Sequence, residues 1–170
     1  HRERRWSATE RAWIGWERKR GKLEQLLAAL ATGHSNAFVD LGRASQLASG
    51  VRHLLTLDSD TGLPPGRLRE LVGVAAHPLN QPRLAPDGRR VVSGFGILQP
   101  RLATPLPERG HGTAFHALFA GQCGIDPYSA ASSEVYQDLF GEGSFTGKGL
   151  LHVAALEVVL GGRLPDGLVL

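Results

Sequence analysis

The chain has 170 residues, a length that fits a single domain with a sizeable core. Its composition, 42% hydrophobic and 21% charged, excludes a disordered chain, and no apolar run reaches the roughly twenty residues of a membrane-spanning helix. The net charge is only +3, because Glu3, Glu10 and Glu17 stand among the seven Lys and Arg of the first twenty residues. A nucleic-acid partner is therefore not expected, since such proteins carry an uncompensated basic face.

Three further counts bear on the class of protein. The single cysteine, Cys123, excludes an internal disulfide and fits a reducing compartment. Glycine supplies 22 residues, against a usual share of about 7%, which predicts tight turns and close backbone approaches. Because the sequence contains no Met, we expect a segment of a larger protein. We treat residues 1–170 as one domain, a fragment of a larger one.

The first predicted element is a helix over residues 8–31. Ser7 and Glu10 have the spacing of a capping box, in which the hydroxyl accepts from a free backbone N–H and the carboxylate reaches back. Apolar residues then recur at helical intervals. We expect the three tryptophans near its start to pack against a neighbouring element, since exposed they are costly: Trp6, Trp13 and Trp16.

An apolar, Leu-rich strand predicted over residues 51–57 leads into two carboxylates, Asp58 and Asp60. In an extended segment residues two apart point to the same side, so both carboxylates would face one divalent cation, which prefers hard oxygen ligands. A polar turn after a strand is the ordinary structural explanation of so short a pattern. The turn formers of residues 62–66 fit both interpretations.

The rest of the chain alternates helices and strands, with mixed signals over residues 33–50. This order predicts an α/β fold. The predicted elements are a helix over residues 66–76, a long strand over 90–100, helices over 114–120 and 133–140, a glycine-rich loop over 141–149, and an apolar helix over 150–160.

The glycine-rich loop does not match the known phosphate-binding patterns. A P-loop would need Gly at Glu142 and Ser or Thr at Gly149, and the dinucleotide pattern would need Gly at Thr146. What remains is a loop that leads into a helix whose amino end suits an anion or a sugar hydroxyl, or a plain glycine turn. No serine or histidine shows a nucleophile or metal-ligand spacing, and Lys22 alone indicates a solvated charge.

Five strings of the sequence together resemble one family. They are HRERRW at 1–6, WERKRGKLE at 16–24, LDSDT at 57–61, AHPLN at 76–80 and YQDLFGEGSFTGKG at 136–149. They look like the glycosyltransferase region of bacterial cyclic β-1,2-glucan synthases, over nearly the whole chain. More broadly, the order of motifs is similar to processive GT-A glycosyltransferases of the cellulose-synthase kind. The resemblance implies part of a GT-A, Rossmann-like sheet flanked by helices.

The resemblance also implies a reaction, the inverting transfer of glucose from UDP-glucose to the 2-hydroxyl of a growing glucan. A divalent cation, Mg²⁺ or Mn²⁺, held by Asp58 and Asp60 would stabilise the UDP leaving group, which makes these the catalytic, metal and donor residues. Lys22 matches a position on the donor side. The residues that match the loop lining the sugar and acceptor site are Glu142, Phe145, Thr146, Gly147 and Lys148.

Two parts of such an enzyme are expected outside these residues. The uridine-binding strand and helix would precede His1, and the carboxylate general base that inversion needs would follow Leu170. We therefore expect no glucan synthesis by the chain alone. The family's enzymes are multidomain proteins of the bacterial inner membrane with a cytoplasmic transferase region, so the implied partners are a nucleotide sugar, a glucan acceptor and the remainder of the parent protein.

Two other classes of function stay open. A metal-dependent nucleotidyl- or phosphate-transfer enzyme shares the logic of paired carboxylates, and turnover of a sugar-free substrate with Mn²⁺ would favour it. A non-catalytic interaction module would use the tryptophan-bearing helix against a partner.

Overall fold

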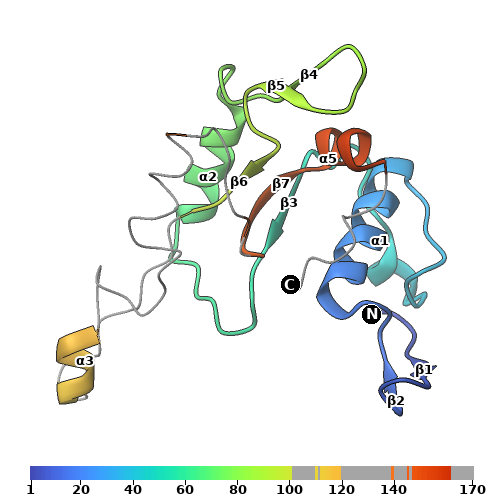
Figure 1. Ribbon diagram of the computed structural model, residues 1–170, viewed down its shortest axis with the longest axis horizontal. Coiled ribbons are helices and arrows are strands. Elements are labelled where there is room, and N and C mark those ends of the chain that lie inside the picture. Colours follow the sequence, from blue (N-terminus) through green and yellow to red (C-terminus); the bar gives the residue numbers. More distant parts are fainter. Residues whose placement is uncertain (101–109, 111, 120–138, 140–144, 146, 162–170) are drawn as a thin grey trace. The chain divides into compact units, whose positions relative to one another are not determined.

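The computed structural model describes residues 1–100, 110, 112–119, 139, 145 and 147–161 (Figure 1). The chain forms two compact units, one made of His1–Leu98 with Gly149–Leu170 and the other of Gln99–Lys148. The single domain expected over residues 1–170 stays a prediction. The pocket described below lies within the first unit.

Helices and strands alternate along the described chain, which confirms the mixed α and β character predicted from the sequence. The strands pair antiparallel. The elements are β1 (Arg5–Ser7), β2 (Ala12–Ile14), α1 (Arg18–Thr32), a 3-10 turn (Gly42–Ser45), β3 (His53–Thr56), α2 (Arg67–Ala76), β4 (Arg83–Leu84), β5 (Val91–Ser93), β6 (Ile97–Leu98), α3 (Ala114–Phe119), β7 (Gly149–His152) and α5 (Val153–Leu160).

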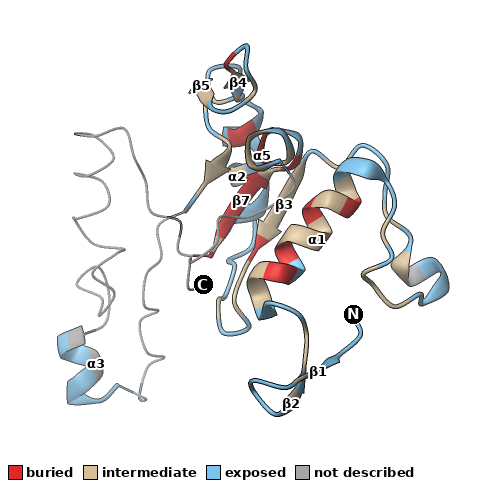
Figure 2. Cartoon of the chain, turned by 45° about the vertical axis from the view of Figure 1, so that its right-hand side comes forward, coloured by how far each residue is buried: buried red, intermediate tan, exposed pale blue. Residues whose placement is uncertain are grey.

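A three-stranded sheet in the order β3-β7-β6 forms the centre of the first unit. Its middle strand carries Leu150, which lies opposite Leu55 and Leu98 and is only 3% exposed. The neighbouring Leu151 is equally buried. Fully burying such a side chain contributes about 2 kcal/mol, so β7 holds its two neighbours by apolar packing as well as by hydrogen bonds. Figure 2 shows the buried residues of β7 in red.

The helix α1 packs against α5, and α5 follows β7 and contacts it. The side chains they bury are small or aliphatic, which allows the helices to approach closely. Figure 2 shows buried residues along one side of α1. The buried apolar side chains of the two helices are Leu23, Leu27 and Ala29 on α1 and Val153, Ala155 and Leu156 on α5.

The predicted helix over residues 8–31 is wrong before Arg18, because the chain first forms the β1–β2 hairpin. The Ser7 hydroxyl does accept from the Glu10 N–H at 3.2 Å, but this bond closes the hairpin loop. Arg11 leaves the loop with φ 49°, which a helix does not allow. A local hydrogen bond of this spacing suits a loop as well as a helix start, and the cross-strand pairing decided between them.

The tryptophans are exposed, so none is buried against a neighbouring element as expected, although the Trp16 ring lies close to Gly21 of α1. Trp6 is 56% exposed, Trp13 62% and Trp16 45%. Trp6 and Trp13 lie opposite each other in the hairpin, with ring centroids 6.0 Å apart in an edge-to-face arrangement. Such aromatic pairs contribute about 0.5–1.5 kcal/mol, which supports a short hairpin without a core.

The long strand predicted over residues 90–100 is two short strands, because the chain turns at Gly94. This residue has φ 70°, and a Cβ on it would lie 2.0 Å from the carbonyl oxygen of Gln81. Before it, β5 pairs with β4, and after it β6 pairs with β7. Its glycine was correctly read as a sign of close backbone approach, but the approach redirects the chain and ends the strand.

The apolar helix predicted over residues 150–160 begins three residues later, because residues 149–152 pair as strand β7. The helix ends at Gly161 in the left-handed conformation (φ 58°), as the sequence predicted. The prediction for residues 66–76 is confirmed by α2, and α3 supports that for 114–120. The helix predicted over residues 133–140 lies, apart from Leu139, outside the described residues.

Candidate functional site

A pocket of about 550 Å³ lies between α1 and the segment that ends β3. This volume falls within the roughly 300–1,000 Å³ typical of small-molecule sites. Both apolar and charged side chains line it. The residues that line it are Arg2, Gly15, Arg18, Lys19, Lys22, Leu23 and Leu26 on one side and Leu54, Leu55, Thr56, Leu57, Asp58 and Ser59 on the other.

Four cationic side chains and one carboxylate line this pocket. The ammonium of Lys19 pairs with the carboxylate of Asp58, linking the first turn of α1 to the residue after Leu57. These two side chains are 30% and 35% exposed, so the pair is partly shielded from water. Asp58 pairs with Lys19, and Glu10 pairs with Arg18, so two carboxylates stand against four cations and the pocket favours an anionic ligand.

Arg2 ties the amino-terminal segment to the start of α1. One guanidinium nitrogen, Nη1, donates to the carbonyl of Trp16 at 2.8 Å and to Oε1 of Gln25 at 2.9 Å. The other, Nη2, donates to the carbonyl of Arg18 at 2.6 Å. Partial burial lowers the pKa of Arg2 from its ordinary value, yet a guanidinium stays charged at neutral pH. Arg2 therefore places a fixed positive charge on the pocket wall.

Gly21 allows the segment before α1 to lie against the helix. A Cβ at this position would lie 2.3 Å from the carbonyl oxygen of Trp16 and 2.7 Å from its ring. The same Trp16 carbonyl accepts from Arg2. Gly21, the residue before Lys22, therefore allows the Trp16 indole and the Arg2 guanidinium to lie beside the first turn of α1.

The two predicted metal ligands lie in a turn, and the extended conformation expected for them is wrong. The N–H of Thr61 donates to the carbonyl of Asp58 at 3.1 Å, which closes a turn with Asp60 inside it. Asp58 lines the pocket, whereas Asp60 is exposed. The turn-forming residues directly after Asp60 end the strand before Asp58, so the two carboxylates are not on an extended segment.

The donor set of this turn fits a cation that a substrate helps to hold. Among the described residues, no group of three or more His, Cys, Asp or Glu is arranged to hold a metal ion. Mg²⁺ in enzymes is commonly bound by one or two carboxylates, and substrate phosphates and water complete its shell. Asp58 and Asp60 would provide the hard oxygens for that arrangement. The described residues do not form a metal site made of protein ligands alone.

The remaining predicted site residues divide between the pocket and the second unit. Lys22 lines the pocket together with Asp58, so the structure brings these two predictions together. Phe145, Gly147 (φ 83°) and Lys148 belong to the second unit. The other two predicted acceptor-site residues, Glu142 and Thr146, lie outside the described residues.

Sequence reasoning missed three of the pocket's cations, Arg2, Arg18 and Lys19. A signal for one of them was present, because Lys19 and Lys22 are three residues apart and neighbours on a helix surface. The ion pair between Lys19 and Asp58 joins residues 39 apart in sequence, and no local pattern predicts a contact of that range.

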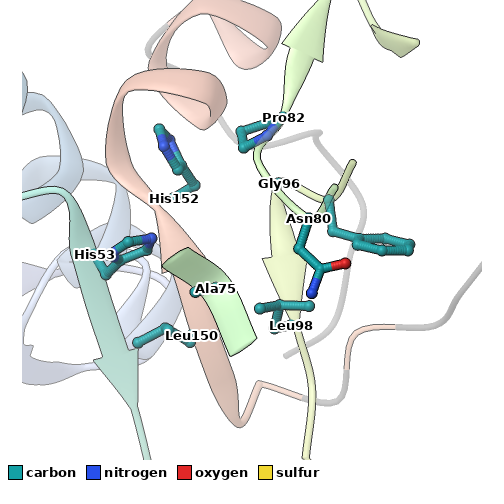
Figure 3. Close-up of a pocket in the computed structure, with 9 residues that line it drawn as sticks. His53, Ala75, Asn80, Pro82, Gly96, Leu98, Leu150 and His152 are labelled. Atoms are coloured by element: carbon teal, nitrogen blue, oxygen red, sulfur yellow. The ribbon is translucent and has the colours of Figure 1, made fainter. Parts of the chain in front are cut away.

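A second, much smaller cavity of about 10 Å³ lies beside the central sheet. It has room for about one water molecule and none for a substrate. Figure 3 shows His53 on β3 and His152 on β7 beside it, with ring centroids 5.3 Å apart and perpendicular planes. Burial lowers the pKa of both imidazoles. Nδ1 of His152 accepts from the Ala155 N–H at 3.2 Å and caps α5.

No helix in the described part of the chain has the length and apolarity needed to cross a membrane. No family model matches the sequence. The whole chain is 44% identical, over 170 residues, to the cyclic beta-(1,2)-glucan synthase NdvB of Rhizobium meliloti (strain 1021). The chain spans 6% of the length of that relative. This similarity confirms the resemblance to cyclic β-1,2-glucan synthases found in the sequence, and the chain is similar from end to end to a segment of that relative.

Proposed function

We propose that the chain is part of the glucosyl-transferring region of such a synthase, and that its pocket binds the diphosphate of UDP-glucose. The observation that carries this proposal is the placing of Asp58 at the end of β3 in a pocket whose other charged residues are all cations. A sugar nucleotide presents two phosphates. Even with Arg18 paired to Glu10 and Lys19 to Asp58, the four cations that line the pocket keep an excess of positive charge that suits the phosphates. The 44% identity to a glucan synthase supports the same chemistry.

In this proposal the charged side chains of the pocket and of the turn after β3 have different tasks. Arg2 and Lys22 offset the charge of the diphosphate, and the apolar residues of α1 limit access of water. Asp58 and Asp60 hold a divalent cation, Mg²⁺ or Mn²⁺. When bound, that cation supplies Lewis-acid stabilisation of the UDP leaving group. In this proposal the fold is a GT-A glycosyltransferase, and transfer to the glucan inverts the anomeric carbon.

The glucan acceptor would bind at the glycine-rich segment of the second unit. Phe145 offers an aromatic face and Lys148 a hydrogen-bond donor, both of which suit sugar hydroxyls and ring faces. Glu142, Thr146 and Gly147 complete this proposed acceptor set. The remainder of a parent multidomain protein at the cytoplasmic face of the inner membrane would supply the general base and the uridine pocket.

Binding of UDP tests the proposal directly. We expect UDP to bind the chain in the presence of Mn²⁺, measured by isothermal titration calorimetry, and to bind weakly when the metal is chelated. Asp58→Asn removes one negative metal ligand and should weaken metal-dependent binding at least about tenfold. Asp87→Asn makes the same chemical change at an exposed turn outside the pocket and should leave binding unchanged. Equal affinity of the Asp58 variant and the unaltered chain would refute the proposal.

The exposed tryptophans support a second candidate, an interaction module. Trp6 and Trp13 form an apolar surface on a hairpin, and surfaces of this kind mark contacts with other protein parts. The two functions separate in a complete synthase. If Trp13→Ala abolishes glucan synthesis while Asp58→Ala and Asp60→Ala leave it intact, the interaction module is the correct assignment.

A further inference from the structure

The carboxylate proposed to hold the metal already has a positive partner within the chain. Lys19 pairs with Asp58, and both side chains line the pocket. An ammonium and a divalent cation compete for the same carboxylate oxygens, because each neutralises the negative charge. This pair therefore bears directly on how strongly a metal binds.

Two other cations of the pocket are directed elsewhere. Arg18 pairs with Glu10 at 2.6 Å, and Arg2 donates to backbone carbonyls of the segment that starts α1. Lys22 lines the same pocket one turn along the helix from Lys19. A lysine ammonium is a point charge on a flexible four-carbon stem, so it can leave Asp58 by rotating its side chain without moving the helix.

The position of Lys19 explains why the pair forms. It lies in the first turn of α1, at the positive end of the helix, where a cation is unfavourable by about 0.3–1 kcal/mol. The Asp58 carboxylate offsets this cost and compensates the neighbouring positive charges. When the carboxylate is taken by a metal, Lys19 returns to an environment that favours any nearby anion.

We propose that Lys19 is a built-in counter-ion of the metal site, which occupies Asp58 in the absence of a divalent cation and turns to the diphosphate once the cation binds. This inference rests on the proposed function. It predicts that loss of the Lys19 charge strengthens binding of the metal and weakens binding of the nucleotide. Metal binding would release an ammonium for phosphate, so metal and nucleotide strengthen each other's binding through Lys19.

The test compares metal binding with nucleotide binding in five forms of the chain. Mn²⁺ alone is titrated and the free ion is followed by electron paramagnetic resonance, and UDP is then titrated in saturating Mn²⁺. Lys19→Gln should bind Mn²⁺ about three- to fivefold more tightly than the unaltered chain, as expected for loss of a partly exposed ion pair. The same variant should bind UDP more weakly. Lys19→Arg keeps the pair and should bind Mn²⁺ like the unaltered chain.

Lys22→Gln is the matched control, since it removes one positive charge from the same helix and pocket. If loss of any nearby charge strengthened metal binding, both Gln variants would behave alike, and that result would overturn the inference. A second result would also overturn the inference: Asp58→Asn abolishes Mn²⁺ binding, but Lys19→Gln leaves it unchanged. In that case the proposed metal site would stand. Absence of Mn²⁺ binding in every form, with and without UDP, would refute both proposals. Circular dichroism of each variant shows whether its fold is kept.

Discussion

The replacement of Gly21 by Ala is expected to destabilise the chain, although the same change stabilises most helices. Alanine favours a helix interior over glycine by about 1 kcal/mol. At Gly21, however, a Cβ would lie 2.3 Å from the Trp16 carbonyl oxygen and 2.7 Å from both the Trp16 ring and Cβ of Glu17. Distances below 3 Å force the neighbours to move.

The size of the effect follows from these two opposing contributions. Overpacking of this kind typically costs about 1–3 kcal/mol, and the gain in helix propensity returns about 1 kcal/mol. The net loss of unfolding free energy is then up to about 2 kcal/mol. Displacing the Trp16 carbonyl also disturbs its hydrogen bond from Arg2, so the variant should weaken anion binding in the pocket as well.

Urea denaturation followed by circular dichroism measures this effect, and Gly73→Ala is its control. Gly73 lies in α2 with nothing within 4 Å of an added Cβ, so that variant should gain about 1 kcal/mol from helix propensity alone. The two substitutions are chemically identical and differ in their surroundings. If Gly21→Ala stabilises the chain as much as Gly73→Ala does, the close approach of Trp16 to α1 is incorrect.

Two more predictions concern the turn at Gly94 and the pair of histidines on the central sheet. Gly94→Ala should cost more than about 2 kcal/mol of unfolding free energy, because the residue has φ 70° and its Cβ would lie 2.0 Å from the Gln81 carbonyl oxygen. Gly50→Ala is the control, at φ 71° with nothing within 4 Å of the added Cβ, and should cost only about 1 kcal/mol. Equal losses of the two variants in urea denaturation would refute the clash at Gly94. Burial lowers the pKa of His53 and His152 in the folded chain. As the pH falls below about 6.5, the unfolded chain therefore takes up protons before the folded chain does. The free energy of unfolding should be highest above that pH and decline below it. The double Asn variant of these two histidines, which keeps a capping oxygen at 152, should flatten that decline in thermal unfolding; an unchanged pH profile would contradict the assignment.

The sequence by itself determined the features that depend on local chemistry. An apolar run followed by carboxylates and turn formers predicted β3 and the position of Asp58 at its end, because burial and turn propensity act on neighbouring residues. The helix α2 and the stop at Gly161 followed from the same kind of rule. The long strings shared with glucan synthases predicted the relationship that the 44% identity confirms.

Tertiary structure decided how those segments are used. The hairpin of residues 5–14 prevailed over the predicted helix through the pairing of Trp6 with Trp13, and residues 149–152 became a strand because β3 and β6 pair with them on both sides. The ion pair of Lys19 with Asp58 likewise needed the packing of α1 beside β3. In each case the deciding partner lies across the fold or on another strand, and hydrophobic period and local propensity carry no information about such a partner.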